Sequence, residues 1–379
     1  MTLFYKFLKH LAIIFSIGLI GYWLLWKTLH MLNPIDKVWA DFKFSDIYFG
    51  YFQEKKLDED IYFIDIGFKN NNVTRQQISE FINTINENHK PKVIGLDVDF
   101  KIDNSVSDEI NNDLINSLNE DNIVLCYNLV NFQNKWMRNT SELPIDYSQV
   151  KTGYTNNLIA AKGLDFGVER FFTPFLIEGD DSLKHFSIAV AEKMGIDVNS
   201  LLKKNNKVMI NFQYTYNDPI SIGDVDNYYK LKDKIVIVGL FTKNKEGNPL
   251  YNEDVHYTPS NKYYFGKSPP NMYGGEIMAS IISSITHNTF IKYYKYFSKW
   301  LNIFLSFVLY FVLLYFLGKS HNIFIATTII QQFGLVTLLM LASILFVSIY
   351  NVYIDLTILA LIAFFSVEFV GVIDEIIHL

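Results

Sequence analysis

Long uncharged stretches lie near both ends of the chain, and a polar region separates them. Near the N-terminus, residues 11–26 read LAIIFSIGLIGYWLLW and lie between Lys9 and Lys27. As a helix they would rise about 24 Å, slightly less than a hydrocarbon core of about 30 Å, and the two lysines can extend to the interfaces. We therefore predict a short N-terminal segment over 1–10 and a transmembrane helix over 11–29.

A cleaved secretory signal peptide is the alternative for this stretch. Lys6 and Lys9 would supply its basic region. However, the residues that follow, WKTLHMLNPID, contain no pair of small residues where cleavage could occur. We therefore favour an uncleaved anchor.

Three further transmembrane helices are predicted near the C-terminus. Residues 300–317 and 323–350 contain no charge, and residues 356–373 contain only Glu368. The polar connectors between them are short, which favours antiparallel neighbours, and Tyr and Trp residues cluster where the first stretch begins, as at a membrane interface. We place the three helices at 299–317, 323–350 and 356–373.

The region from residue 30 to residue 298 alternates between strand and helix patterns. Apolar runs predict strands at 61–68, 92–100, 122–130, 207–215 and 234–240, and a hairpin within 165–179. Apolar residues at helical spacing predict helices at 75–88, 109–119, 183–194 and 276–285. The expected N-caps are Thr74, Ser105 or Ser107, and Ser182, and the expected helix ends are Pro91 and Gly195.

This order begins as βαβαβ, which predicts a mainly parallel mixed sheet with helices on its faces. The expected fold is an α/β domain over 30–298, inserted between one N-terminal and three C-terminal transmembrane helices. No internal repeat or low-complexity linker divides the region, so we expect one domain. The helix at 276–285 is expected to lead into the transmembrane helix near Lys299.

Composition excludes several classes of protein. Of 379 residues, 50% are hydrophobic and 19% charged, which argues against disorder and against a purely cytosolic enzyme. Cys126 is the one cysteine, so no intramolecular disulfide can form, and the net charge of −6 without a basic run indicates no nucleic-acid partner. Phosphate-binding glycine loops, nucleophile elbows and paired histidines are absent from the sequence, so we predict no cofactor and no metal.

Seven segments in order resemble the second type of CHASE domain, the extracellular sensory modules of bacterial cyclases and histidine kinases. They are VWADFKF (38–44), IYFIDIGF (61–68), KVIGLDVDF (92–100), DFGVERFF (165–172), LKDKIVIVGL (231–240), DVHYTP (254–259) and MYGGEIMASII (272–282). The resemblance covers about residues 1–375, including the membrane helices. The sequence departs from the family pattern at Lys43, where arginine is usual, at Gly275, where valine is usual, and at Met278, where histidine is common.

The resemblance implies a periplasmic or extracellular sensory domain between the first and second spans. The lysines beside the spans leave the orientation undecided, so it is the resemblance that places both termini in the cytoplasm of a multi-pass protein of the bacterial inner membrane. Relatives usually carry a kinase or cyclase after the last span, whereas this sequence stops at DEIIHL. We therefore expect a separate cytoplasmic effector as partner, a homodimer, and no enzymatic activity; the resemblance does not define the ligand.

Three aspartates are the first candidate ligand-binding residues. Asp65, Asp97 and Asp99 lie in or after two strands expected to be parallel neighbours, and α/β sheets bind ligands at the carboxyl ends of their strands. They would bind a cation or polar solute, or act in catalysis. In the structural interpretation Asp65 and Asp97 instead bond loop amides or pair with Arg170.

A loop after the strand at 234–240 holds the other candidates, Asp254, His256 and Thr258. Asp and His are metal-ligand types, but two ligands do not make a site. The simpler interpretation is that Thr258 and the following proline set the shape of the loop.

Glu368 is the candidate for coupling within the membrane, because a charge at depth tends to face protein. We expect it to bond Gln331 or Gln332 on a neighbouring helix, or else to extend to the interface.

Three functions are thus open. The first is a sensor that relays a signal through its membrane helices to the cytoplasmic partner. The alternative is a structural or assembly subunit of an envelope complex. The third is a membrane-bound enzyme that uses Asp65, Asp97 and Asp99.

Overall fold

The computed structural model describes residues 43–67, 73–100, 105–132, 135–139, 150–155, 167–178, 181–198, 207–244, 247–250, 254–261, 270–317 and 330–363. These residues form two compact units. The α/β unit comprises the described residues from Phe49 to Tyr293, and the helical unit comprises those up to Tyr48 and from Tyr294 onward.

A seven-stranded sheet is the centre of the α/β unit. Its order is β12 (Ile220–Ser221), β2 (Ile61–Asp65), β13 (Ile235–Gly239), β3 (Val93–Leu96), β4 (Ile123–Phe132) and β5 (Lys135–Asn139), and β6 (Lys151–Tyr154) also pairs with β4. All pairs are parallel except β4 with β5. The predicted mainly parallel mixed sheet is confirmed.

The predicted adjacency of the first two long strands is wrong. β13, which comes late in the chain, lies between β2 and β3: Val236 pairs with Tyr62 on one side and with Ile94 on the other. All five residues of β13 are buried, as in an inner strand of a parallel sheet, but which two strands flank it is a long-range pairing that a local pattern does not reveal.

Two helices begin at the predicted caps. In α4 (Arg75–Asn88) the Thr74 hydroxyl accepts a hydrogen bond from the Gln77 amide, and the Gln77 side chain bonds back to Thr74. Ser107 caps α5 (Asp108–Leu118) through the Ile110 amide. Each cap satisfies a backbone donor that the first turn leaves free.

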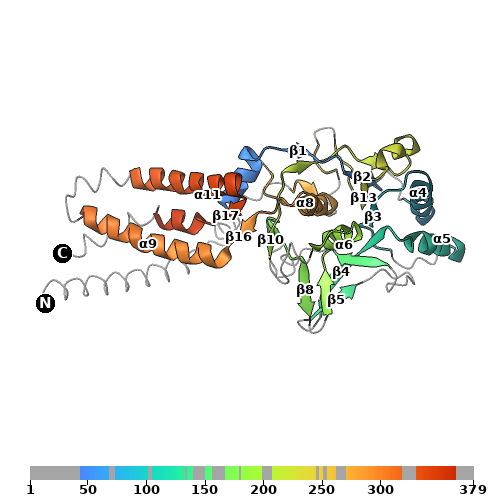
Figure 1. The fold of residues 1–379 in the computed structure, drawn as a ribbon, viewed down its shortest axis with the longest axis horizontal. Helices are drawn as coiled ribbons and strands as arrows, with labels where there is room; N and C mark the ends of the chain where they lie inside the picture. Colours follow the sequence, from blue (N-terminus) through green and yellow to red (C-terminus); the bar gives the residue numbers. More distant parts are fainter. Residues whose placement is uncertain are drawn as a thin grey trace. The chain divides into compact units, whose positions relative to one another are not determined.

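The sheet is covered on both faces by helices (Figure 1). Alternate strand residues face opposite sides. One core holds Ile64, Val236 and Val238 with residues of α4 and α5, and the other holds Phe63, Ile235 and Ile237 with residues of α6 (Phe186–Lys193) and α8 (Gly274–Thr286).

Ser182 does not cap a helix, contrary to the prediction. It lies in β9 (Asp181–Lys184), which pairs with β8 (Phe175–Glu178) as a hairpin later than the one expected. His185 caps α6 instead: its Nδ1 accepts from the Ser187 amide at 3.2 Å. The predicted end is confirmed, since Gly195, with φ of 81°, follows the last turn of α6.

The predicted strand at 207–215 is broken in two, β10 (Val208–Met209) and β11 (Tyr214–Thr215). Between them the buried Asn211 side chain accepts a hydrogen bond from the Gln213 amide, which turns the chain. The remaining short elements of the unit are β1 (Lys56–Leu57), β7 (Phe171–Phe172), β14 (Val255–His256), β15 (Met272–Tyr273), β16 (Lys292–Tyr293) and the 3₁₀ helix η3 (Val225–Leu231).

The helical unit consists mainly of long apolar helices. Its elements are α3 (Phe44–Ile47), α9 (Lys295–Leu317), the π-helical η4 (Ile330–Leu335), α11 (Val336–Tyr350), β17 (Val352–Tyr353) and a helical stretch at 357–363, and the π-helical η1 (Tyr48–Phe52) crosses the boundary to the α/β unit. Within the described part of the chain one helix, Phe333–Tyr350, is long and apolar enough to cross a membrane. The predicted span at 11–29 and parts of those at 323–350 and 356–373 lie outside the described residues.

α8 does not continue into α9, contrary to the expectation of one helix running toward Lys299. α8 ends at Thr286, Asn288 adopts a left-handed conformation with φ of 50°, and α9 begins only at Lys295. A movement of α8 therefore cannot pass to α9 along one rigid helix.

Gly153 in β6 provides a test of the packing. A Cβ atom there would lie 2.4 Å from Cα of Phe186, a backbone atom that cannot step aside. We expect Gly153→Ala to destabilise the α/β unit by about 3 kcal/mol, as over-packing does. Gly223→Ala is the control, because a Cβ atom there meets nothing within 4 Å. Thermal unfolding of both variants in detergent would measure the difference, and equal stability would contradict the close contact.

Candidate functional site

The carboxyl edge of the parallel sheet is the candidate site. β2, β13 and β3 end side by side there, and Asp65 and Asp97 stand at the ends of the outer two of these strands. β14 and the start of α8 contribute the other polar groups. Ligands of open α/β sheets bind at such an edge.

Asp65 ties the end of β2 to the loop that follows β13. One carboxylate oxygen accepts from the amides of Gly67, at 3.0 Å, and Phe241, at 2.9 Å. The other accepts from the Thr242 hydroxyl at 2.6 Å. These bonds correspond to the structural interpretation, in which Asp65 bonds loop amides.

The carboxyl group of Asp97 has a raised pKa at this edge. Burial raises its pKa to about 7, and the negative charge of Asp254 adds to the rise, while the Cys126 thiol and His256 oppose it. The thiol in turn has a pKa well above its usual value, through burial and the charge of Asp97. Asp99 is exposed, so the three aspartates do not share one environment.

His256 lies between two carboxylates. Its Nδ1 is 2.6 Å from Oε1 of Glu169, and its Nε2 is 3.1 Å from Oδ1 of Asp254. Burial by itself lowers the pKa of His256, but the hydrogen bonds and charges of Asp254 and Glu169 outweigh it and raise the pKa to about 10. The imidazole is therefore a cation at neutral pH.

Asp254 also contacts the first turn of α8. Its backbone is left-handed, with φ of 54°, and its carbonyl accepts from the Gly274 amide at 3.0 Å. A Cβ atom at Gly274 would lie 2.7 Å from both carboxylate oxygens, so a side chain there would displace the carboxylate. The carboxylate is favoured at this position by the amide groups and dipole of the helix start.

A second ion pair lies at the same helix start. Glu276 is buried, accepts from the Tyr273 amide at 3.0 Å and pairs with Lys243 of the loop after β13. The Tyr273 hydroxyl donates to the Thr242 carbonyl at 2.6 Å. α8 is thereby held to the loop that Asp65 also holds.

Two departures from the family pattern have a structural explanation. A side chain at Gly275 would meet the Phe241 ring at 2.5 Å, so this ring fills the space that valine would take. Met278 is buried in the core shared with α6, where its backbone carbonyl accepts from the Ser187 hydroxyl.

Thr258 is buried and part of the loop framework. Its amide donates to Oδ1 of Asn271 at 3.0 Å, and its hydroxyl bonds Ser260 at 2.7 Å. Arg170 is buried as well, and its carbonyl accepts from the Ile210 amide. It does not supply the hydrogen bonds of Asp65, which come from Gly67, Phe241 and Thr242.

Three charged members of the edge were not predicted from the sequence: Glu169, Lys243 and Glu276. Glu169 and Glu276 lie within segments that resembled the CHASE pattern, so a signal was present for them. Among the described residues no group of three or more His, Cys, Asp or Glu side chains is arranged to hold a metal ion. The charged side chains of the edge instead form ion pairs: His256 pairs with Glu169 and Asp254, and Lys243 pairs with Glu276.

The predicted coupling residues in the membrane region stay a prediction. Gln331 and Gln332 lie in the π-helical η4, whereas Glu368 lies outside the described residues.

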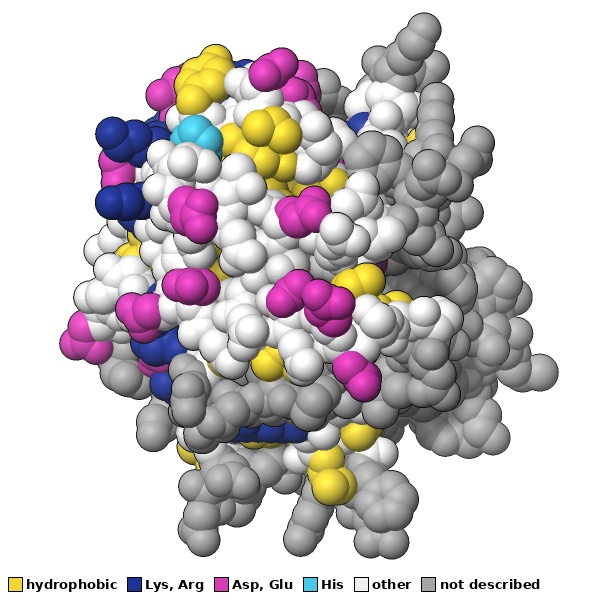
Figure 2. All heavy atoms as spheres, turned by 90° about the vertical axis from the view of Figure 1, so that its right-hand side faces the viewer, with side chains coloured by type: hydrophobic (Ala, Val, Ile, Leu, Met, Phe, Trp, Pro, Cys, Tyr) yellow, Lys and Arg dark blue, Asp and Glu magenta, His cyan; other side chains and the backbone are white. Residues whose placement is uncertain are grey.

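A groove lies between α4 and α5. Its volume is about 670 Å³, and Glu80, Glu109, Asp113 and Glu120 are among its lining residues. Figure 2 shows acidic side chains spread over this end of the α/β unit, with lysine and arginine side chains mainly along one border. A surface of this charge repels anionic solutes.

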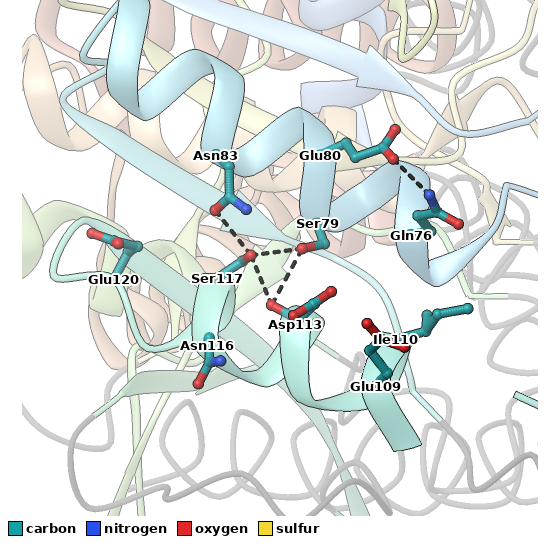
Figure 3. A pocket seen from close by; sticks show the side chains of 10 residues that line it. All are labelled: Gln76, Ser79, Glu80, Asn83, Glu109, Ile110, Asp113, Asn116, Ser117 and Glu120. Atoms are coloured by element: carbon teal, nitrogen blue, oxygen red, sulfur yellow. Dashed lines mark hydrogen bonds between the residues drawn. The ribbon is translucent and has the colours of Figure 1, made fainter. Parts of the chain in front are cut away.

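Two serines form the floor of this groove (Figure 3). The hydroxyls of Ser79 and Ser117 bond each other at 2.8 Å, and each bonds the Asp113 carbonyl. Both serines are buried, and their small size lets the two helices approach closely. The groove is thus bounded by a close contact between helices.

Comparison with known proteins gives one family. The family model described as the CHASE2 domain matches residues 26–316. No curated protein and no solved structure matches the chain.

Asp65→Asn tests the role of the aspartate at the end of β2. An amide cannot accept from all three donors, so we expect a loss of about 2 kcal/mol in the free energy of unfolding, as for hydrogen bonds to a charged group. The exposed Asp99→Asn is the matched control and should change stability little. Chemical unfolding monitored by tryptophan fluorescence would compare them; a neutral Asp65→Asn would contradict the structural role.

His256→Gln tests the ion pairs through their pH dependence. The pKa of His256 is raised in the folded state, so its contribution to stability is full below the unfolded value of about 6.5 and is lost as the pH rises toward the folded value. We therefore expect His256→Gln to lower the unfolding midpoint most near pH 6, and less at each step up to about pH 10.

Glu169→Gln removes one of the two carboxylates that raise this pKa. In this variant the stability that His256 contributes should be lost over a lower pH range than in the wild-type protein. A His256→Gln effect that is the same at every pH would rule out the charged imidazole.

Proposed function

The chain belongs to the CHASE2 family of sensory domains, and on this premise we propose that it is a membrane-anchored sensor whose α/β unit faces the outside of a bacterial inner membrane. The observation that carries the proposal is the extent of the match, which includes every described residue of the α/β unit. Both termini are proposed to lie in the cytoplasm, after one N-terminal and three C-terminal spans.

The surface of α9 supports the membrane part of the proposal. Large apolar side chains are exposed along this helix at positions that share one face: Trp300, Phe304, Phe307 and Phe311. These positions follow the helical repeat, and contiguous exposed apolar surface of this kind is unstable in water. Lipid would cover it.

The carboxyl edge of the sheet is the proposed place of stimulus recognition. His256 is paired with both Asp254 and Glu169 at a position where ligands of α/β sheets bind. A charged ligand or partner entering there would exchange one of these ion pairs for its own. Because Asp254 also contacts the first turn of α8, such an exchange would act on that helix.

The signal is proposed to reach a separate cytoplasmic effector through the membrane helices, with the protein acting as a homodimer. The enzyme hypothesis has less support, because Asp65 is occupied by loop donors and Asp99 is exposed.

Cysteine labelling tests the topology. In a Cys126→Ser background, Tyr229→Cys places a thiol at a residue whose side chain is 64% exposed on the α/β unit. Lys319→Cys places one between the second and third predicted spans. We expect a membrane-impermeant maleimide to label the first variant in intact spheroplasts and the second only after permeabilisation.

The reverse labelling pattern would overturn the orientation. Purification of the intact protein in detergent, with identification of what accompanies it, tests the effector. An envelope protein bound in constant amount, with no cytoplasmic protein, would favour an assembly subunit over a sensor.

A further inference from the structure

The helical unit contains a cluster of buried polar side chains at the connector that follows α11. Ser298, Asn302, Ser343, Asp355 and Thr357 are all buried there, among residues that are otherwise mainly apolar. Polar groups in such surroundings are stable only when they are hydrogen-bonded, so their arrangement constrains the unit.

Asn302 joins α9 to this connector. Its Nδ2 donates to the carbonyl of Asp355 at 2.6 Å and to that of Ser298 at 2.7 Å. Its Oδ1 accepts from the Leu359 amide at 3.2 Å. The Asn302 side chain therefore bonds backbone groups both of α9 and of the segment that follows α11.

Asp355 joins the same connector to the segment that precedes the α/β unit. Its carboxylate accepts from Nζ of Lys43 at 2.8 Å and from the Thr357 amide at 3.2 Å. Its own amide donates to the Ser298 hydroxyl of α9 at 3.3 Å. Lys43 lies immediately before α3, and 312 positions separate it from Asp355.

α11 is held at the same point, because the Ser343 hydroxyl donates to the Ile354 carbonyl at 2.9 Å. Apolar contacts reinforce the cluster: Phe44 of α3 shares a core with Leu339 of α11 and with Leu356 and Leu359.

Neither chain connection between the two units is a continuous α-helix. On the way in, the π-helical η1 follows α3 directly. On the way out, the left-handed Asn288 and the non-helical residues before Lys295 precede α9. π-Helical turns such as η1 are frequent at functional sites, whereas the left-handed residue after α8 ends that helix.

We propose that the cluster around Asn302 and Asp355 is a clamp that makes the segment entering the α/β unit and the helix leaving it move as one body. A change in the α/β unit is then transmitted through both connections together and not through α9 alone. The use of the clamp rests on the proposed function; its existence does not, since a clamp could join these elements in a protein that senses nothing.

Hydrogen exchange of the full chain in detergent, as a function of denaturant, tests the clamp. Amides of α3, of the first turns of α9 and of residues 354–363 should share one opening reaction, because cooperative units exchange together. Lys43→Met should separate α3 from the other two, with exchange at α3 at least 10-fold faster (about 1.4 kcal/mol). Lys299→Met, at an exposed lysine of the same end of α9, is the control and should leave the three segments together.

The charge-reversed pair, Lys43→Asp with Asp355→Lys, should restore the shared opening. If the Asp355 variants fail to fold, Ser298→Ala tests the same cluster, because it removes the hydroxyl that accepts from the Asp355 amide. The clamp is wrong if α3 already opens independently in the wild-type protein, or if Lys43→Met leaves its exchange unchanged. Neither result would bear on the topology test, so the two proposals fail separately.

Discussion

The position of β13 between β2 and β3 is the constraint on which the α/β unit depends. Val236 and Val238 belong to one core and Ile235 and Ile237 to the other, so a strand from late in the chain contributes to both cores. The loop after β13 then emerges at the carboxyl edge, where Phe241 and Thr242 bond Asp65 and Lys243 pairs with Glu276. The candidate site is therefore built in part on the loop that follows the central strand of the core.

Local features of the fold could be predicted from the sequence because local physics decides them. Thr74 and Ser107 cap their helices through amides three residues away, and the apolar faces of α4 and α5 follow the helical repeat. Ser182 failed as a cap because pairing of β9 with β8 competes for the same residues, and His185 then takes that role. Strand order lay beyond local reasoning, since it depends on which strand gains most from burial on both faces.

The candidate site follows the same division. Asp254 and His256 stand two positions apart, so their pairing could be predicted from the sequence. Glu169 lies in a distant segment of the chain, and only the fold brings it to His256. The three aspartates at strand ends were recognisable as residue types. Their roles separate in the structure because Asp65 faces amides, Asp97 faces Asp254 and Cys126, and Asp99 faces solvent.

The same physical device operates in both units. Apolar packing determines that helices and strands associate, but it tolerates shifts in register; a buried polar group with few acceptable partners does not. In the α/β unit, Asp65 and Glu276 hold the loop after β13 to β2 and to α8. In the helical unit, Asn302 and Asp355 hold α9, α11 and Lys43 to one connector. Between these two sets of contacts no single helix runs, because α8 ends at Thr286 and α9 begins at Lys295.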